Sequence, residues 1–434
     1  MSVIIIGAGY TGLAAAWELC KAGVKVTVLE REDDIGGLAG TFELAPGVRL
    51  EKFYHHWFTS DTDVLRLIDE LGLASSIQTK YSSTGIYYAN SIFRLANPFD
   101  LLRFPGIPLM DRVRTGLLAL YARTITNWHP LEEETALCWL ERIGGRPALQ
   151  VIWEPLLRGK FGDESANVSA VWIWNKLKLR GSSRNKAGKE SLLYFAGGFG
   201  ALTAAIRAKL QSHGVSIVTG CTVTQIRSDH DAVHIATNQG DMNSEQLLCT
   251  TPLPVFLELT PSLPGAYREL HGAIRFLGNV CVVLRLDRSL SSTYWLNVAD
   301  PSFPFVGVIE HTNFDPASNY GGEHIAYLSK YLPTTDPLFA MSDSEVLAYS
   351  MPFVKRIFPH FSPEWIRRSH VWRAHYSQPV TTIGYSRLIP KTRTPLPGVW
   401  LSTMAQIYPQ DRGTNYAVRQ GRAVALEMLR DRRG

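Results

Sequence analysis

Three glycines and one carboxylate near the start of the chain carry the most specific chemical signal in the sequence. Gly7, Gly9 and Gly12 have the G-x-G-x-x-G spacing, and Glu30 follows them at the end of a later apolar run. Gly7 permits a tight turn, Gly9 lets the backbone approach a pyrophosphate, and Gly12 lets a helix pack close to a strand. Glu30 can accept hydrogen bonds from both hydroxyls of a ribose, and its charge repels a 2′-phosphate. These residues predict a dinucleotide-binding site.

The elements around these residues are those that such a site needs. Val3–Ile6 is an apolar run of strand type, residues 13–22 are predicted to form a helix, and Val24–Leu29 is predicted to form a second strand. The N-terminus of the helix then faces the bound anion. A glycine motif alone is weak evidence, but here the complete β-α-β unit surrounds it.

A second glycine motif indicates which dinucleotide is bound. Gly36 and Gly37 lie six and seven positions after Glu30, and Leu38-Ala39-Gly40-Thr41 follows them. This string resembles the second fingerprint of the FAD enzymes grouped with amine oxidases, protoporphyrinogen oxidase and phytoene desaturase. The resemblance implies FAD, with the paired glycines near the pyrophosphate. Non-covalent FAD is expected, because no cysteine lies near the C-terminal residues 402–415. The resemblance also implies cofactor contacts at Arg31, Leu38, Ala39 and Val223. The alternative is a glycine-rich turn in an NAD enzyme.

The C-terminal string from Ser402 to Asn415 resembles the last motif of the same family, where the chain approaches the flavin ring and ribityl chain. A helix is predicted over Asn415–Arg430, and its N-terminus would stabilise the negative charge of reduced flavin. The resemblance implies cofactor contacts at Arg412, Gly413, Thr414 and Asn415. The alternatives are that Thr414 and Asn415 only cap the helix and that Asp411 and Arg412 form a local ion pair.

Residues 51–61 contain the adjacent pair His55 and His56 among four aromatic residues. The segment partly resembles one in UDP-galactopyranose mutase, a flavoenzyme of the same fold, with His56 and Phe58 on the matching positions. Glu51 and Tyr54 depart from that pattern. The resemblance implies that His56 lies beside the flavin, where a histidine can tune the ring or move a proton. The alternative is a histidine satisfied within an aromatic core.

A run of polar residues, Glu310-His311-Thr312-Asn313, lies at the end of an apolar strand. Burying such groups without partners is costly, so we expect them to line a cavity. Glu310, His311 and Asn313 are therefore candidate catalytic residues together with His56. An exposed strand end is the alternative.

Composition bounds the class of protein. The 434 residues suffice for two domains, and 45% hydrophobic with 19% charged residues indicates a globular protein. The net charge of +5 gives no reason to expect nucleic acid. The five cysteines are scattered, so we expect no disulfide framework, no metal site and a reducing, cytoplasmic compartment. Neither a signal peptide nor a membrane span is expected.

The predicted fold is α/β, with an FAD-binding Rossmann domain of the glutathione-reductase type and an interleaved α+β substrate domain. The FAD-binding domain is assigned to residues 1–75, 190–255 and 396–434, and the substrate domain to residues 76–189 and 256–395. Within the substrate domain, residues 97–180 are predicted to be mostly helical, and 276–287 and 323–332 to be long strands.

The predicted function is an FAD-dependent oxidoreductase that exchanges a hydride between flavin N5 and a bulky, largely apolar substrate, isoprenoid-like or an amine. The alternative is a nucleotide-sugar mutase that uses reduced flavin without net redox. It would need arginines that hold a diphosphate, for which Arg158, Arg180 and Arg184 are candidates. A flavin-binding scaffold without activity is the third interpretation.

Residues 99–128 mix Leu, Phe and Trp with four arginines and few acids. That composition suits a helix lying at a membrane surface and delivering a lipid-like substrate. It would associate the protein with the inner surface of a membrane. The alternative is a core helix with a basic outer face. The oligomeric state is left open.

Overall fold

The nucleotide-type domain is built on a parallel sheet whose strands come from distant parts of the chain. The computed structural model describes residues 2–95, 98–182, 190–229, 231–300 and 302–431. The five-stranded sheet has the order β10-β2-β1-β14-β20, and every neighbouring pair is parallel. Its strands are β1 (Ser2–Ile6), β2 (Lys25–Leu29), β10 (Ser216–Val218), β14 (Gln246–Cys249) and β20 (Val399–Leu401). They are drawn from all three segments assigned to this domain, while the domain boundaries stay a prediction.

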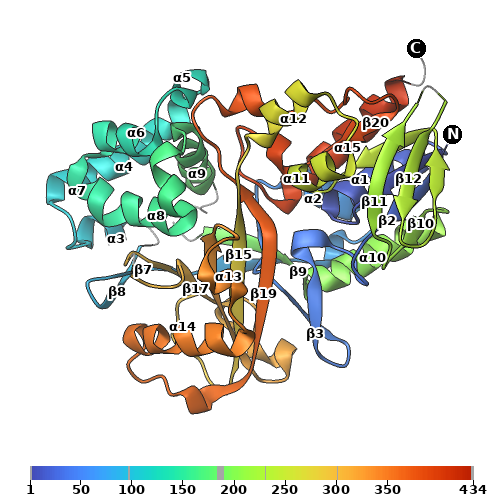
Figure 1. Cartoon of the computed structure of the whole chain (residues 1–434). Coiled ribbons are helices and arrows are strands. Elements are labelled where there is room, and N and C mark those ends of the chain that lie inside the picture. Colours follow the sequence, from blue (N-terminus) through green and yellow to red (C-terminus); the bar gives the residue numbers. More distant parts are fainter. Residues whose placement is uncertain (1, 96–97, 183–189, 230, 301, 432–434) are drawn as a thin grey trace.

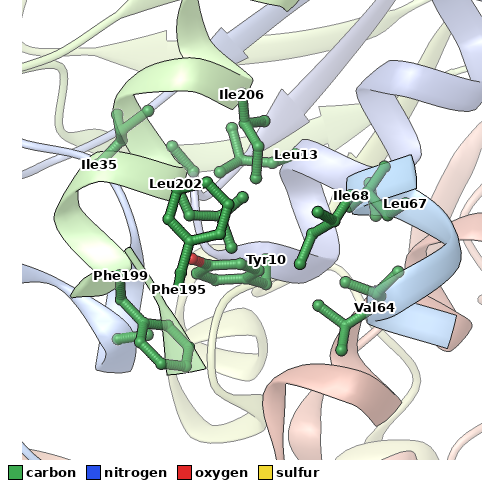
Figure 2. Close-up of a cluster of buried hydrophobic side chains, with 14 of the residues drawn as sticks. Tyr10, Leu13, Ile35, Val64, Leu67, Ile68, Phe195, Phe199, Leu202 and Ile206 are labelled. Carbon is green, nitrogen blue, oxygen red and sulfur yellow. The ribbon is translucent and has the colours of Figure 1, made fainter. Parts of the chain in front are cut away.

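Helices α1 (Tyr10–Lys21) and α10 (Gly198–Ser212) pack on this sheet, α15 (Thr414–Asp431) packs on α1, and α2 (Thr62–Glu70) packs on α15. Figure 2 shows Tyr10 and Leu13 of α1 between Leu202 and Ile206 of α10 on one side and Ile68 of α2 on the other. Gly421 lets α15 lie against the start of α1, because a Cβ there would be 2.2 Å from the Thr11 carbonyl oxygen. The N-terminus of α15 is thereby held beside the first glycine motif.

A second, seven-stranded sheet has the order β19-β15-β18-β17-β16-β7-β8 and is antiparallel except for the β16–β7 pair. Its strands are β7 (Thr84–Tyr88), β8 (Ser91–Arg94), β15 (Phe276–Leu286), β16 (Trp295–Val298), β17 (Gly307–Glu310), β18 (His324–Leu332) and β19 (Ile366–Pro379). The two long strands predicted at 276–287 and 323–332 are β15 and β18. Helix α14 (Asp343–Ile357) packs on β19, and α13 (Pro337–Ala340) precedes it.

The stretch predicted to be mostly helical forms a separate group of helices on one side of the molecule, opposite the parallel sheet (Figure 1). The helices are α3 (Pro98–Arg103), α4 (Leu109–Thr124), α5 (His129–Glu132), α6 (Ala136–Gly144), α7 (Arg146–Ala148), α8 (Glu154–Phe161) and α9 (Ala170–Ser182). The Trp174 indole N–H donates to the Ala122 carbonyl oxygen at 2.8 Å, which ties α9 to the end of α4.

Smaller elements complete the described chain. They are the hairpin β3 (Thr41–Ala45) and β4 (Val48–Glu51), the sheet of β5 (Trp57–Phe58), β9 (Glu190–Phe195) and β6 (Ile77–Ser82), the sheet of β11 (Val223–Ser228), β12 (Val233–Thr237) and β13 (Met242–Ser244), and the helices α11 (Leu253–Leu259) and α12 (Gly265–Gly272). Strand β9, assigned to the FAD domain, pairs with β6, assigned to the substrate domain. The two assigned domains therefore share a sheet at this boundary.

Candidate active site

The first glycine motif forms a turn that no side chain could occupy. Gly7 has φ of +102°, and a Cβ added to it would lie 2.6 Å from Thr250 Oγ1. A Cβ on Gly12 would lie 2.0 Å from the Gly7 carbonyl oxygen. Helix α1 starts at Tyr10, directly after Gly9, so its free N–H groups face the same turn. The predicted helix began three residues later, because its apolar periodicity starts only inside the first turn.

The second glycine motif lies against the first, backbone to backbone. The Gly36 N–H donates to the Ala8 carbonyl oxygen at 2.9 Å. A Cβ on Gly37, whose φ is +58°, would lie 3.2 Å from the Gly9 Cα. Leu38 is half-buried and Ala39 buried in the single helical turn that follows. Two glycine-lined backbone segments thus form one cradle, which fits the pyrophosphate of a dinucleotide.

Glu30 is held beside this cradle by two main-chain donors. Its Oε2 accepts from the Ala8 N–H at 2.8 Å, and its Oε1 accepts from the Glu32 N–H at 3.0 Å. Each carboxylate oxygen has further lone pairs, so ribose hydroxyls can still bind. Arg31 points its guanidinium to solvent, where it pairs with Glu32 at 2.8 Å.

Val223 lies near Glu30 because the chain before it runs along the end of β2. The Cys221 N–H donates to the Glu30 carbonyl oxygen at 2.8 Å, and the Gly220 N–H donates to the Glu32 carbonyl oxygen at 3.0 Å. Val223 then opens β11 as a buried residue. Val223 therefore lies close to the main chain of Glu30, and its contact with the cofactor stays a prediction.

The side chains of Thr414 and Asn415 tie the C-terminal loop to the segment that carries His56. Thr414 Oγ1 accepts from the Trp57 indole N–H at 2.8 Å. Asn415 Oδ1 accepts from the N–H groups of Asp63 and Val64 at 2.8 and 3.0 Å, which caps α2. Neither interaction caps their own helix. Gly413 beside them is exposed. Contact of this loop with the flavin stays a prediction.

The side chains of Asp411 and Arg412 bind different partners and form no ion pair with each other. Asp411 Oδ2 lies 2.5 Å from Lys176 Nζ and 3.6 Å from Lys160 Nζ. Burial alone would raise the pKa of Asp411, but Lys160, Lys176 and the neighbouring arginine hold it well below its usual range. Arg412 donates to Gln378 Oε1 at 3.1 Å and to the Tyr331 hydroxyl at 2.5 Å.

The contacts of Lys160, Lys176 and Tyr331 with the C-terminal loop were not predicted from the sequence. These residues come from α8, α9 and β18, which are remote along the chain and contain no motif. Only the fold brings them to the C-terminal loop. A lone Lys on a predicted helix is indistinguishable from a solvated surface residue, so no local pattern could have found them.

His56 lies against four aromatic side chains that we call the aromatic wall: Phe58, Tyr294, Trp295 and Phe314. Its Nδ1 lies 2.9 Å from the Tyr294 hydroxyl. The centroids of Phe58, Trp295 and Phe314 lie 5.7, 5.9 and 6.1 Å from that of the imidazole. The adjacent His55 is different, since its Nδ1 is 2.6 Å from the Phe53 carbonyl oxygen and burial lowers its pKa to about 4.

Glu310 and Asn313 anchor a loop, a role that the sequence did not predict. Glu310 is 1% exposed, and its carboxylate accepts from the N–H groups of Leu290 and Ser291, each at 2.8 Å, and from two serine hydroxyls. Asn313 Nδ2 donates to the carbonyl oxygens of Ser291 and Thr293 at 2.8 and 3.0 Å. The cost of burying these groups is offset by hydrogen bonds within the chain. These hydrogen bonds explain the burial of Glu310 and Asn313 without a cavity, and a place for them in a substrate site stays a prediction.

His311 is buried and belongs to a series of hydrogen-bonded polar side chains. Its Nε2 lies 2.7 Å from the Tyr320 hydroxyl, which donates to Asp315 Oδ2 at 2.9 Å, and Lys80 Nζ lies 2.9 Å from Asp315 Oδ1. Burial lowers the pKa of His311 to about 4. Its ring centroid is 6.3 Å from that of Phe314, which also packs on His56. Among the four predicted catalytic residues, these two histidines therefore share one aromatic neighbour.

Glu51 caps the start of α10, a structural role that was not predicted from the sequence. It is fully buried, with its Oε1 accepting from the Phe199 N–H at 2.7 Å and from the Tyr194 hydroxyl at 2.9 Å. Burial raises its pKa. A carboxylate at this place caps α10, whose first turn begins at Gly198.

The comparison with protein families decides which cofactor this cradle serves. The family model described as "Flavin containing amine oxidoreductase" matches residues 10–429. The chain belongs to this family. Membership confirms the predicted family resemblance, the Rossmann-type fold, the FAD cofactor and the oxidoreductase class of the family.

Individual relatives are distant. The mitochondrial protoporphyrinogen oxidase of Nicotiana tabacum is 27% identical over 192 residues, which are 42% of this chain and 37% of that protein. The cyclohexylamine oxidase of Brevibacterium oxydans IH-35A has a TM-score of 0.71 at 17% identity, with 100% of this chain and 99% of that chain covered. Reduced UDP-galactopyranose mutase has a TM-score of 0.74 at 17% identity, with 99% and 95% covered. At this identity the two structures show the fold alone.

The first curated relatives are matched over 37% to 61% of their own length. Within the described residues, no helix is long and apolar enough to span a bilayer, and no cluster of three or more His, Cys, Asp or Glu side chains could hold a metal ion. All five cysteines are free.

Proposed function

We propose that the protein is an FAD-dependent oxidoreductase that exchanges a hydride with a C–H, C–N or C=C bond of a bulky, largely apolar substrate. The bound FAD supplies the hydride acceptor or donor. The observation that carries the proposal is the aromatic wall around His56, which is tied to the C-terminal loop through Trp57 and Thr414. Such a wall offers an apolar substrate a dry surface next to a group that can move a proton.

The chain's own residues divide the remaining work. The paired glycine segments accept the pyrophosphate, and Glu30 holds the ribose. The N-terminus of α15 lies where it can stabilise negative charge. Phe58, Trp295 and Phe314 exclude water and orient the substrate, while His56 holds or transfers a proton at its Nε2. Glu310 and Asn313 act indirectly, because they fix the loop that carries Tyr294, whose hydroxyl contacts His56.

Anaerobic reduction tests the proposed reaction. Purified FAD-loaded protein is mixed with isoprenoid, amine and nucleotide-sugar compounds while the absorbance of oxidised flavin is followed. The proposal expects one apolar class to bleach the flavin, and oxygen or another acceptor to restore it. It is overturned if oxidised enzyme is inert while pre-reduced enzyme isomerises a nucleotide sugar through many turnovers without an acceptor.

That second outcome is the mutase alternative, whose diphosphate-binding arginines the structure supports only weakly. Arg158 is 61% exposed and pairs with Glu154 on its own helix at 2.8 Å. The Arg180 side chain and the whole of Arg184 lie outside the described residues. The mutase alternative therefore rests on the partial resemblance around His56.

Residues 99–128 expose an unusual amount of apolar surface, and we propose that they dock on an anionic membrane surface that delivers a lipid-like substrate. Eight large hydrophobic side chains on α3 and α4 are between 42% and 72% exposed: Phe99, Leu102, Leu109, Met110, Val113, Leu117, Leu120 and Tyr121. Arg103 and Arg123 are exposed with them. Arg112 donates to the carbonyl oxygens of Ile107 and Leu102 instead. The proposed location is the cytoplasmic side of a membrane.

A further inference from the structure

A cleft of about 350 Å³ separates α9 from the start of α15 and the loop at Pro409 and Gln410. We refer to it as the α9–α15 cleft. Three cationic residues line it, Arg123 from α4, Lys178 from α9 and Arg419 from α15, and no carboxylate lines it. The sequence pattern gave no hint of it, because its walls come from three segments far apart in the chain.

Two of these three cations have no carboxylate partner in the described parts of the chain. Arg419 donates to Asp63 Oδ2 at 2.8 Å, and Asp61 also acts on it electrostatically. Lys178 Nζ instead donates weakly to the Ile125 carbonyl oxygen at 3.4 Å and lies 4.8 Å from the Trp174 ring centroid. Arg123 is exposed at the end of α4. The cleft therefore carries an excess of two positive charges.

A buried acceptor in the same wall is unsatisfied. Asn175, 5% exposed, has an Oδ1 atom without a hydrogen-bond partner among the described residues. A buried acceptor that lacks a donor costs free energy. The Asn175 oxygen itself is covered by its neighbours, so a ligand donor would reach it only after a small shift of the wall, which Trp174 and Tyr416 also line.

We propose that the α9–α15 cleft binds the phosphate of a phosphorylated substrate, an inference that deepens the proposed function and rests on it. Two uncompensated cations match the two charges of a phosphate monoester or diphosphate better than the single charge of a carboxylate. Gln410 in the cleft directly precedes Asp411 and Arg412, so the phosphate is held beside the loop expected to contact the flavin. In this proposal the cleft binds the phosphate of the substrate, and the aromatic wall around His56 binds the part that reacts.

The probe for this site is inorganic pyrophosphate, titrated calorimetrically into FAD-loaded protein. FAD loading is required because the vacant glycine cradle would itself bind the probe. The Arg123→Glu/Lys178→Glu variant is expected to bind pyrophosphate at least about tenfold more weakly. Arg103→Glu/Arg146→Glu makes the same change in charge on exposed helix positions outside the cleft and is expected to leave binding unchanged. The milder Lys178→Gln reports in the same direction if the double variant does not fold.

Equal dissociation constants in the wild type and the Arg123→Glu/Lys178→Glu variant overturn the cleft as a phosphate site. Malonate binding as tightly as pyrophosphate overturns the preference for phosphate. A protein that takes up no FAD overturns the proposed function. The cleft is then still judged by the difference between the two double variants, because the glycine cradle is unchanged in both and binds the probe equally. Weakened pyrophosphate binding with unchanged FAD content supports the proposal.

Discussion

At the scale of single residues, the groups with a geometric requirement were predicted best. At Gly7 and Gly12 a Cβ would collide with Thr250 or with backbone. At Gly37 a positive φ is combined with a tight contact to Gly9, so glycine is favoured at all three positions. Such a requirement leaves a trace in the sequence. The sequence around Glu310 is ambiguous, because a buried carboxylate can bind either a substrate or the main chain of a loop. The four groups that donate to Glu310 come from residues 289–291, whose turn cannot be deduced from residue types.

Glu30→Ala is expected to weaken FAD binding roughly 10- to 150-fold, since a hydrogen bond to a charged group contributes about 1.5–3 kcal/mol. The effect on folding should be the smaller one, because the Glu32 N–H is exposed and only the bond from the buried Ala8 N–H is lost inside the protein. The FAD dissociation constant from fluorescence titration is the measurement. Glu32→Ala, the exposed neighbour, is the matched control. An unchanged constant in a well-folded Glu30→Ala protein would rule out Glu30 as the ribose ligand.

His311 should make stability depend on pH. Its folded pKa of about 4 lies below the ordinary value of 6.5, because burial disfavours the charged ring. The unfolded chain therefore takes up the proton first, and stability falls as pH drops from 6.5 towards 4. His311→Gln removes this titration. Urea unfolding at pH 7 and pH 5 should show a smaller loss of stability in the variant than in the wild type. The same loss in both proteins would contradict the buried neutral histidine.

At the scale of elements, the β-α-β unit, the helical stretch and the two long strands were predictable because each has a strong local period. The starts of elements were harder to predict, since α1 begins at Tyr10, three residues before its predicted position. Its first turn, Tyr10-Thr11-Gly12, contains no aliphatic residue and therefore shows no apolar period. The cap of α2 was unpredictable, since Asn415 supplies it from the other end of the chain.

The exposed face of α3 and α4 predicts binding to vesicles that contain anionic lipid. Leu109→Asp/Leu117→Asp should abolish flotation with such vesicles at low salt, because both side chains are more than half exposed and would enter the interface. Leu270→Asp/Leu426→Asp places the same charges on exposed leucines elsewhere and should float like the wild type. Flotation of the first variant at wild-type levels would reject the docking surface.

At the scale of the whole molecule, the candidate active site forms only when segments that are remote in the chain meet. The cradle uses residues near both 7 and 37, the aromatic wall uses residues near 56, 294 and 314, and the loop near 412 joins them to α8, α9 and β18. The sequence motifs predicted the cofactor, whose recognition is local. They could not predict the substrate, because its surroundings come from pairings between segments that are far apart in the chain.

The rate of flavin reduction in His56→Ala tests the central claim most directly, since that claim places the reaction at the aromatic wall. The variant should retain FAD and lose a factor of about 100 or more in the rate at which substrate bleaches the flavin, the usual contribution of a positioned acid or base. His360→Ala, at an exposed position, should react normally. Bleaching of His56→Ala at the wild-type rate would show that the active site lies elsewhere.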